Sequence, residues 1–298
     1  MSRTRLRGLE VAGIQMGIEV PESFAWEWPE SSVAEYICLP REPEVHIGLR
    51  VCGLSSADLG GDSYGLGAWT FDVASDGDGW LLGLSRRGVR DQLATFDRDF
   101  RNGEIILSPE AAVSRRFPLR TPLDEWIVLH RTVARGGLCL NGAAEALGGG
   151  VRIHLNPHSH DQATPSGSAL KRLASRSRAS VLLREEGGEL LSFSSPWNDP
   201  VDPRLGYSTR VSEIVVREET EVPYRESLDP DEAAELLVRH AVVPLCDEAL
   251  LDRTLTNAKR IAERTRLVRC GDVAESRAPL GWQSSHLQFA FALPSSTY

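Results

Sequence analysis

Lysine is nearly absent from this sequence. Lys171 and Lys259 are the only lysines among 298 residues, so arginine supplies 31 of the 33 basic side chains. The two cations are equivalent on most solvated surfaces, but lysine also serves as a catalytic amine and as a compact phosphate-binding charge. Any site that depends on a lysine must therefore use one of these two residues.

The chain also lacks a cysteine framework and a long apolar segment. Its cysteines are odd in number and contain no C-x-x-C pair, which favours reduced, buried thiols over disulfides or a zinc ribbon. They are Cys38, Cys52, Cys139, Cys246 and Cys270. No run approaches the roughly 18 apolar residues of a membrane span, and no signal-peptide core follows the N-terminal arginines. We therefore expect a cytoplasmic protein that does not contact membranes.

Positive charge is in deficit. The formal net charge of −9 repels nucleic acid and anionic membranes. A composition of 41% hydrophobic and 25% charged residues is typical of a globular protein. We expect one large domain or two small ones, without a nucleic-acid partner.

Residues 1–120 are predicted to form a β-rich N-terminal domain. Residues 45–51 alternate apolar and other side chains with the period of a half-buried strand. Residues 69–84 and 94–107 each contain two such stretches around a turn, which indicates hairpins. In the second hairpin, Asn102 and Gly103 form the dipeptide that a tight type I′ turn prefers.

Residues 121–298 combine helix and strand patterns and are predicted to form a second domain. Helices are expected at 123–134, at 166–176, after the N-cap Asp229, and at 247–264. Short strands are expected at 138–140, 151–155, 181–183, 190–193 and 267–270. The predicted fold class of the whole chain is α/β, with α+β as the alternative.

Five stretches of the second region occur in a characteristic order. They are G-G-L-C-L-N-G-A-A (136–144), V-R-I-H-L-N-P (151–157), V-L-L-R-E-E-G-G (181–188), S-S-P-W (194–197) and E-I-V-V-R-E (213–218). In this order they resemble the HPr kinase/phosphorylase type of P-loop protein, over about residues 120 to 275. The resemblance implies a fold related to the ATP-dependent phosphoenolpyruvate carboxykinases, with a phosphate loop after the second stretch and an acidic metal-binding pair near the third.

The phosphate loop departs from the family pattern. A P-loop needs G-x-x-x-x-G-K-[ST], because its glycines let N–H groups close on the phosphates and its lysine reaches their oxygens. No Gly-Lys dipeptide occurs in the chain. The loop position after the strand holds Asn156, Pro157, His158, Ser159, His160, Asp161 and Thr164. In a register displaced to Pro165, Ala169 and Leu170 stand where Gly-Lys belongs, so both registers lack the lysine.

The other groups that the resemblance implies are also changed. Glu185 and Glu186 are candidates for the acidic pair; alternatively, the pair's positions fall within 175–180, which holds no carboxylate. Asn141 replaces the histidine of the family's Leu-His and cannot act as a general base. Because phosphoryl transfer depends on positioning and charge neutralisation, these replacements predict a loss of ATP chemistry.

Histidines gather where the phosphate loop is expected. His154, His158, His160 and Asp161 fall within eight residues and are suitable ligands for Zn²⁺ or a similar ion. One interpretation is a metal or anion site; the other is a solvated polar loop with His154 packed on the sheet. The remaining histidines are isolated and are interpreted as structural: His46, His130, His240 and His286.

The sequence therefore predicts a non-catalytic regulatory or scaffold protein, a pseudoenzyme that keeps the HPr kinase fold as a binding surface. Two alternatives stay open: an atypical kinase or phosphotransferase with a non-standard phosphate loop, and a metal- or anion-binding protein that uses residues 154–161. No cofactor is expected for the pseudoenzyme. A divalent metal is expected for the metal-binding alternative. A protein partner of unknown identity is expected, and a homo-oligomer is compatible with the sequence.

Overall fold

The computed structural model describes most of the first 155 residues and several later segments. The described residues are 4–22, 24, 35–66, 68–75, 77–114, 117–119, 121–155, 180–197, 208–220, 222–243 and 247–273. Of these residues, 51% lie in strands and 21% in helices. The described part of the chain is thus mostly β, with mixed sheets and few helices, rather than clearly α/β as expected.

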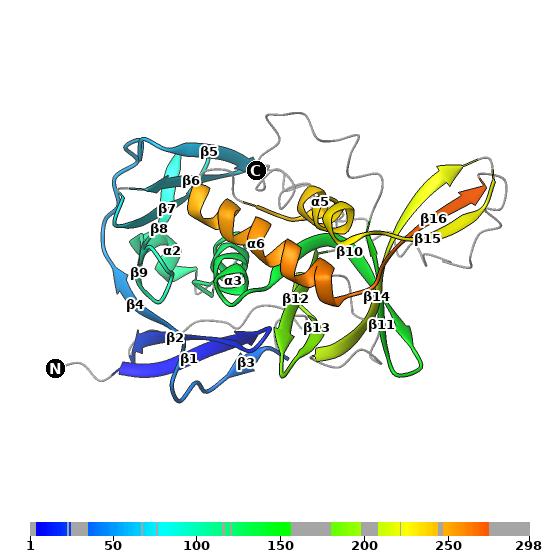
Figure 1. Ribbon diagram of the computed structural model, residues 1–298. Helices are drawn as coiled ribbons and strands as arrows, with labels where there is room; N and C mark the ends of the chain where they lie inside the picture. The colour runs from blue at the N-terminus through cyan, green and yellow to red at the C-terminus, as the bar shows by residue number, and fades with distance from the viewer. Residues whose placement is uncertain are drawn as a thin grey trace, which may run out of the picture.

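Nine strands of the described part, all from residues 4–107, form one sheet (Figure 1). They are β1 (Thr4–Val11), β2 (Ile14–Pro21), β3 (Ile37–Cys38), β4 (Val45–Val51), β5 (Asp62–Leu66), β6 (Trp69–Ser75), β7 (Gly79–Arg86), β8 (Val89–Asp97) and β9 (Asn102–Leu107). Their order is β3-β1-β2-β4-β9-β8-β7-β6-β5, with β2–β4 and β4–β9 parallel. The strand expected at 45–51 and both expected hairpins are confirmed.

The predicted position of the β8–β9 turn is wrong. Asn102 and Gly103 already belong to β9, and the chain reverses just before them, with Phe100 at φ 53°. The Asp97 carboxylate accepts hydrogen bonds from the N–H groups of Arg101 at 2.7 Å and Asn102 at 3.0 Å. This side-chain cap closes the longer turn, and Gly103 is instead needed because a Cβ there would overlap the Phe96 ring.

The second sheet has seven strands within the described residues and comes from the later part of the chain. They are β10 (Leu138–Leu147), β11 (Gly150–Leu155), β12 (Ser180–Glu186), β13 (Glu189–Phe193), β14 (Ser208–Thr220), β15 (Tyr224–Ser227) and β16 (Leu267–Val273). The order is β11-β10-β12-β13-β14-β16-β15. Because β11 also pairs in parallel with β14, the pairings β10-β12-β13-β14-β11 close into a ring.

The register of this ring fixes which strand ends are neighbours. On one edge of β10, Asn141 lies opposite Ser180, the first residue of β12. On the other edge, Gly142 lies opposite Leu155, the last residue of β11. Two strand spacings of about 4.8 Å therefore place the end of β11 roughly 10 Å from the start of β12.

The described helices are α2 (Pro109–Val113), α3 (Leu123–Ala134), α5 (Pro230–His240) and α6 (Glu248–Arg264). The predicted bounds of α3 and the predicted N-cap Asp229, which accepts from two N–H groups of α5, are confirmed. The helix expected from Asp247 begins one residue later, and Asp247 is its N-cap and accepts from one N–H of α6. In Figure 1, α3 and α6 lie between the two groups of strands. α3 is buried from its first residue to Val133, because both sheets and α6 contribute neighbours.

The sequence argues against disulfides and against a membrane-spanning segment, and the structure bears on both points. The described cysteines, Cys38, Cys52, Cys139 and Cys270, are free, and Cys139 is the buried one among them. No helix of the described ranges combines the length and apolar character that a membrane crossing requires. The helix expected at 166–176 lies outside the described residues.

Candidate functional site

Two carboxylic acids are buried side by side in the first turn of α3. Asp124 and Glu125 expose only 4% and 8% of their surface. Acidic residues suit a first helical turn because its unpaired N–H groups carry partial positive charge. The helix packs against β10 and β12, so the two carboxyl groups are enclosed rather than solvated.

Protein donors hold the Asp124 carboxylate. Trp197 donates its indole N–H to Oδ2 at 2.8 Å, and the backbone N–H of Glu125 donates to Oδ1 at 2.9 Å. The side chain of Thr121 hydrogen-bonds to both carboxyl groups. These bonds fix the acidic pair in one orientation.

Burial keeps a proton on this pair. Loss of solvation, reinforced by the charge of Asp124, raises the pKa of Glu125 to about 8. Burial also raises the pKa of Asp124, against the opposing effect of its hydrogen bonds to Trp197 and others. At pH 7 Glu125 is therefore protonated, and the pair contains a group that can exchange a proton near neutral pH.

Cys139 on β10 and Ser180 on β12 extend the pair. Burial and the Glu125 charge raise the pKa of Cys139 to about 12, so this thiol stays neutral and is a poor nucleophile. The Ser180 side chain is hydrogen-bonded to Cys139. Asp124, Glu125, Cys139, Ser180 and Trp197 together form the buried polar cluster.

Two buried polar groups near the cluster have no hydrogen-bond partner within the described residues: Nδ2 of Asn141 and Oγ of Ser195. Asn141 lies opposite Ser180 in the strand register, and Ser195 precedes Trp197 by two residues. Native proteins rarely leave buried polar atoms unpaired. The two groups make this place one candidate site for a ligand or ordered water.

The buried polar cluster lies at the end of β12 that neighbours the start of the expected phosphate loop. That loop would follow Leu155, which the ring register places near Ser180 with β10 between them. The expected loop residues themselves lie outside the described part of the chain: Asn156, Pro157, His158, Ser159, His160, Asp161 and Thr164.

The structure places Glu185 and Glu186 at the opposite end of β12, about 17–20 Å from its first residue at the usual strand rise. Glu185 pairs with Arg260 at 3.5 Å and with Arg264. Glu186 pairs with Arg184. Arginines therefore compensate both charges, and neither carboxylate joins the buried polar cluster.

His154, the described member of the expected histidine group, lies on β11. Its Nε2 is 2.8 Å from Oε2 of Glu145, and its buried Nδ1 has no hydrogen-bond partner in the part of the chain that the structure describes. The bond to His154 lowers the pKa of Glu145. Within the described ranges, no group of three or more His, Cys, Asp or Glu side chains is placed to hold a metal ion. Because His158, His160 and Asp161 lie outside those ranges, the metal site stays a prediction.

The sequence pattern does not single out Asp124 and Glu125, because residues 123–134 are predicted only to form a helix. One available signal is that the two acids stand between Leu123 and Trp126 in a stretch with few other polar residues. At 100° per residue, Asp124 and Glu125 lie on the same side of the helix as Arg131 and Thr132, so the spacing alone predicts a polar, solvated face. That they are buried together depends on the second element packed over them.

Comparison of the chain with protein-family models, with curated proteins and with solved structures finds no match. The fold and the site therefore define the class: a mostly β protein of two mixed sheets, with a buried acidic pair at the start of the helix between them. The likeness to the HPr kinase type rests on the five sequence stretches.

Proposed function

We propose that this chain is a non-catalytic regulatory or scaffold protein, a pseudoenzyme with an HPr kinase-like region that no longer performs ATP chemistry. Its parts would be a β-rich N-terminal domain (1–120) and a degenerate HPr kinase-like domain (121–298). The strand directions support this assignment, because β11, β14 and β16 are parallel neighbours and α5 and α6 precede β16. Parallel pairs require such crossover connections, which P-loop folds also use.

The state of the carboxyl groups carries the proposal. Mg²⁺ binds ionised oxygen ligands that have lone pairs to spare. Near the expected loop, Glu125 is protonated at pH 7 and both oxygens of Asp124 accept hydrogen bonds from the protein. Glu185 and Glu186 are compensated by arginines. None of these four groups offers a free charge to a metal–nucleotide complex.

The lysines support the same conclusion. Lys259 is exposed on α6, a helix whose other face packs on α3 and α5. A lysine that neutralises phosphates has to reach them from the loop that wraps them. Lys171 lies outside the described residues, and neither lysine stands at the loop's Gly-Lys position.

Titration calorimetry of the full chain with ATP and Mg²⁺ tests the proposal. We expect no saturable heat up to millimolar nucleotide. Saturable binding at micromolar concentration would overturn the proposal, and a matched pair of variants would then locate it. Glu125→Gln changes the buried polar cluster, whereas Glu263→Gln changes an exposed glutamate of α6.

One observation favours a second function, an atypical phosphotransferase. A carboxyl group with a pKa of about 8, beside another carboxyl and near the expected loop, has the properties of a general acid or base. Phosphate release from ATP, GTP and pyrophosphate would be measured for the wild type, Asp124→Asn, Glu125→Gln and Glu263→Gln. Turnover lost in the first two variants and kept in the third supports this second function. A wild type without turnover removes it.

The metal- or anion-binding alternative has its own motivation in the unpaired Nδ1 of His154. Metal content before and after chelation, compared between the wild type and His154→Ala, tests it. Equal content in both proteins argues against His154 as a ligand. A regulatory role also implies a protein partner, and sedimentation analysis of the full chain would show whether a second copy can serve as one.

A further inference from the structure

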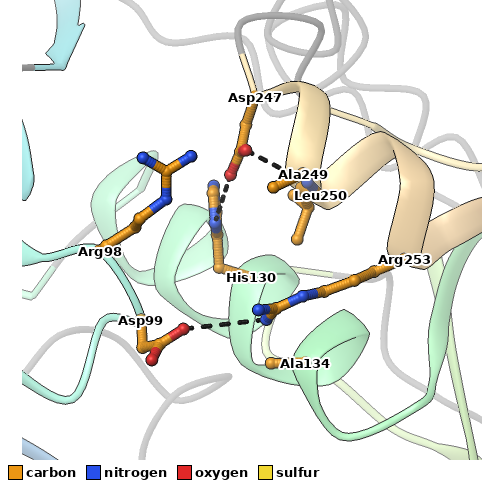
Figure 2. Close-up of a pocket in the computed structure, with 8 residues that line it drawn as sticks. All are labelled: Arg98, Asp99, His130, Ala134, Asp247, Ala249, Leu250 and Arg253. Carbon is orange, nitrogen blue, oxygen red and sulfur yellow. Dashed lines mark hydrogen bonds and ion pairs between the residues drawn. The ribbon is translucent and has the colours of Figure 1, made fainter. Parts of the chain in front are cut away.

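The charges of the pocket at the start of α6 compensate one another. Its volume is about 30 Å³, and its lining includes Arg98 and Arg253 together with Asp99 and Asp247 (Figure 2). The ring of His130 points toward Asp247, with 3.7 Å between Nδ1 and Oδ2. A pocket this small and without surplus charge favours neither anions nor cations. The sheet edges offer more to a partner.

Strand β5 is an end strand of the first sheet within the described residues. It pairs with β6 on one side, and no described strand pairs with its other side (Figure 1). Asp62, Ser63 and Gly65 are exposed, and no atom lies within 4 Å of the place where a Cβ of Gly65 would stand. Such an edge presents a row of backbone N–H and C=O groups that can pair with another strand.

The segment that precedes β5 lies over the face of the sheet and leaves the edge open. Arg90 on β8 donates to the carbonyl of Ala57 at 3.3 Å. The side chain of Leu59 lies over β7, where it would be 3.0 Å from a Cβ at Gly83. Both contacts hold the segment at strands β7 and β8, inward from the edge.

The register shows which backbone groups of β5 point outward. The N–H of Arg87 donates to the carbonyl of Ala68 at 3.3 Å, so these two residues form a hydrogen-bonded pair just before β6 and after β7. Successive residues of a strand point alternately to its two neighbours. Alternate residues of β6, beginning with its first, therefore point to β5 and pair with the first, third and fifth residues of β5. The N–H and C=O groups of Ser63 and Gly65 consequently point away from β6.

A second copy of β5 fits this edge. In the antiparallel register that uses both outward residues, Ser63 lies opposite Gly65 of the second copy, and each such pair exchanges both N–H···O bonds. Tyr64 then lies opposite its own equivalent, and an aromatic cross-strand pair is stabilising. The two Asp62 residues lie four positions apart, roughly 13 Å at the usual strand rise. This distance exceeds the Debye length of about 8 Å, so their repulsion is screened.

The corresponding edge of the second sheet opposes such pairing. The N–H of Leu228 donates to the carbonyl of Leu267 at 3.1 Å, so in β15 the same alternation directs Arg225 and Ser227 outward. A register that joins both of them to a second copy sets Glu226 directly opposite itself, and like charges in this position are destabilising. Because β3 has only two residues, β5 is the described end strand best suited to pair with its own copy.

We propose that two copies of this protein pair through β5. The pairing joins their nine-stranded sheets into one, across a two-fold axis at Tyr64. A five-residue strand pair buries far less than the roughly 1,200 Å² of a stable interface, so the dimer is weak and forms at high protein concentration. The net charge of −9 on each copy adds a repulsion that salt screens.

Sedimentation equilibrium of the full chain, from about 5 to about 500 μM in physiological salt, tests the proposal. We expect a monomer at the lowest concentration and a dimer fraction that rises with concentration. Because salt screens the repulsion between the two copies, the dimer fraction should increase further at higher ionic strength. A chain that stays monomeric over the whole range would overturn the proposal.

Two variants of one residue place the contact at β5. Gly65→Pro removes an outward N–H and leaves the bonds between β5 and β6 intact, so it should raise the dimer dissociation constant at least about tenfold. Gly65→Ala is the matched control: it keeps the N–H, and its methyl group enters open space. Its dissociation constant should stay within about twofold of the wild type. Equal association of the two variants contradicts the assignment.

Hydrogen exchange of the wild type identifies the edge independently, and it decides the question if Gly65→Pro does not fold. Exchange of the Ser63 and Gly65 amides should slow as the protein concentration rises, while Arg225 and Ser227 on β15 stay unchanged. Slowing at β15 alone would place the contact at the other edge and refute the inference. Protection of Ser63 and Gly65 that is already complete in the monomer would mean that the chain covers its own edge, and it would also refute the inference. Neither result depends on whether ATP binds.

Discussion

The first turn of α3 buries Glu125 and its second half buries His130, and the two titratable side chains have different neighbours. Glu125 lies beside another acid and near β10, whereas His130 lies among the aromatic rings of Trp80, Phe100 and Trp126. Burial suppresses the charge in both places, so it raises the pKa of the acid and lowers that of the base. One physical cause therefore gives two opposite dependences of stability on pH.

The two places also differ in how their polar atoms are satisfied. The oxygens of Asp124 accept from Trp197 and from the backbone of Glu125. Nε2 of His130 has no hydrogen-bond partner within the described residues. Near Asp124, Nδ2 of Asn141 and Oγ of Ser195 are likewise buried without one. The protein therefore holds the carboxylate of Asp124 itself, but each of the two places keeps buried polar atoms that no described residue satisfies.

The largest expected effect is that of Glu125→Gln at alkaline pH. The folded pKa of Glu125 is about 8 and its ordinary value is 4.5, so the wild type loses stability as pH rises from 4.5 to 8. In the variant, the free energy of unfolding should not fall with rising pH in this way. It should equal that of the wild type at pH 4.5 and exceed it by about 2–4 kcal/mol at pH 8. Urea denaturation at several pH values measures the difference, with Glu263→Gln as the exposed control. If the free energies of unfolding of variant and wild type differ by the same amount at every pH, the contrast drawn between Glu125 and His130 is wrong.

The next effect is that of His130→Gln at acid pH. Above pH 6.5 neither state of the wild type binds a proton at this site; between 6.5 and about 3 only the unfolded state does. The wild type should therefore lose about 1.4 kcal/mol per pH unit on acidification, or roughly 2 kcal/mol at pH 5. In His130→Gln, the free energy of unfolding should not fall in this way on acidification. His46→Gln, at an exposed position of β4, is the control, and its free energy of unfolding should fall as in the wild type.

Trp197→Phe should have a smaller effect. It removes the donor to Asp124 and should cost about 1–2 kcal/mol at pH 8, and less at pH 4.5, where Asp124 takes up a proton more easily. Trp126→Phe is the matched control, because the buried indole N–H of Trp126 has no hydrogen-bond partner among the described residues. Its cost comes from lost volume and should be the same at both pH values. A pH-independent cost for Trp197→Phe would mean that its bond to Asp124 is unimportant.

The smallest effect is expected for Glu185→Gln, which serves as a reference outside α3. Glu185 pairs with Arg260 and Arg264, whose side chains are 40% and 60% exposed. Solvent screens such pairs, so the cost should stay below about 1 kcal/mol and vanish in 1 M salt. A salt-independent cost above about 2 kcal/mol would show that Glu185 is as consequential as the buried acids of α3.

Local signals explain what could be predicted. The bounds of α3, the N-cap Asp229 and the strands β12 and β13 follow from side chains within a few residues of each other. The β8–β9 turn could not be placed in the same way, because the Asp97 cap competes with the preference of Asn102 and Gly103 for a tight turn. The candidate site was even harder to predict from the sequence, because Trp197 and Asp124, which are hydrogen-bonded, lie 73 positions apart in the chain.

By itself, the sequence determined the shortage of lysine and the absence of a Gly-Lys pair, which are read directly from its residues. It also determined most of the positions where strand and helix patterns occur, because these patterns depend on residues close together in the chain. The tertiary structure decided that β11 closes a ring with β14 and that Glu185 and Glu186 lie far from the loop end of β12. It also decided that His130, an isolated histidine in the sequence, meets Asp247 and two arginines. The physical reason is that burial and charge at a site are set by distant segments brought together, and these set its proton affinity.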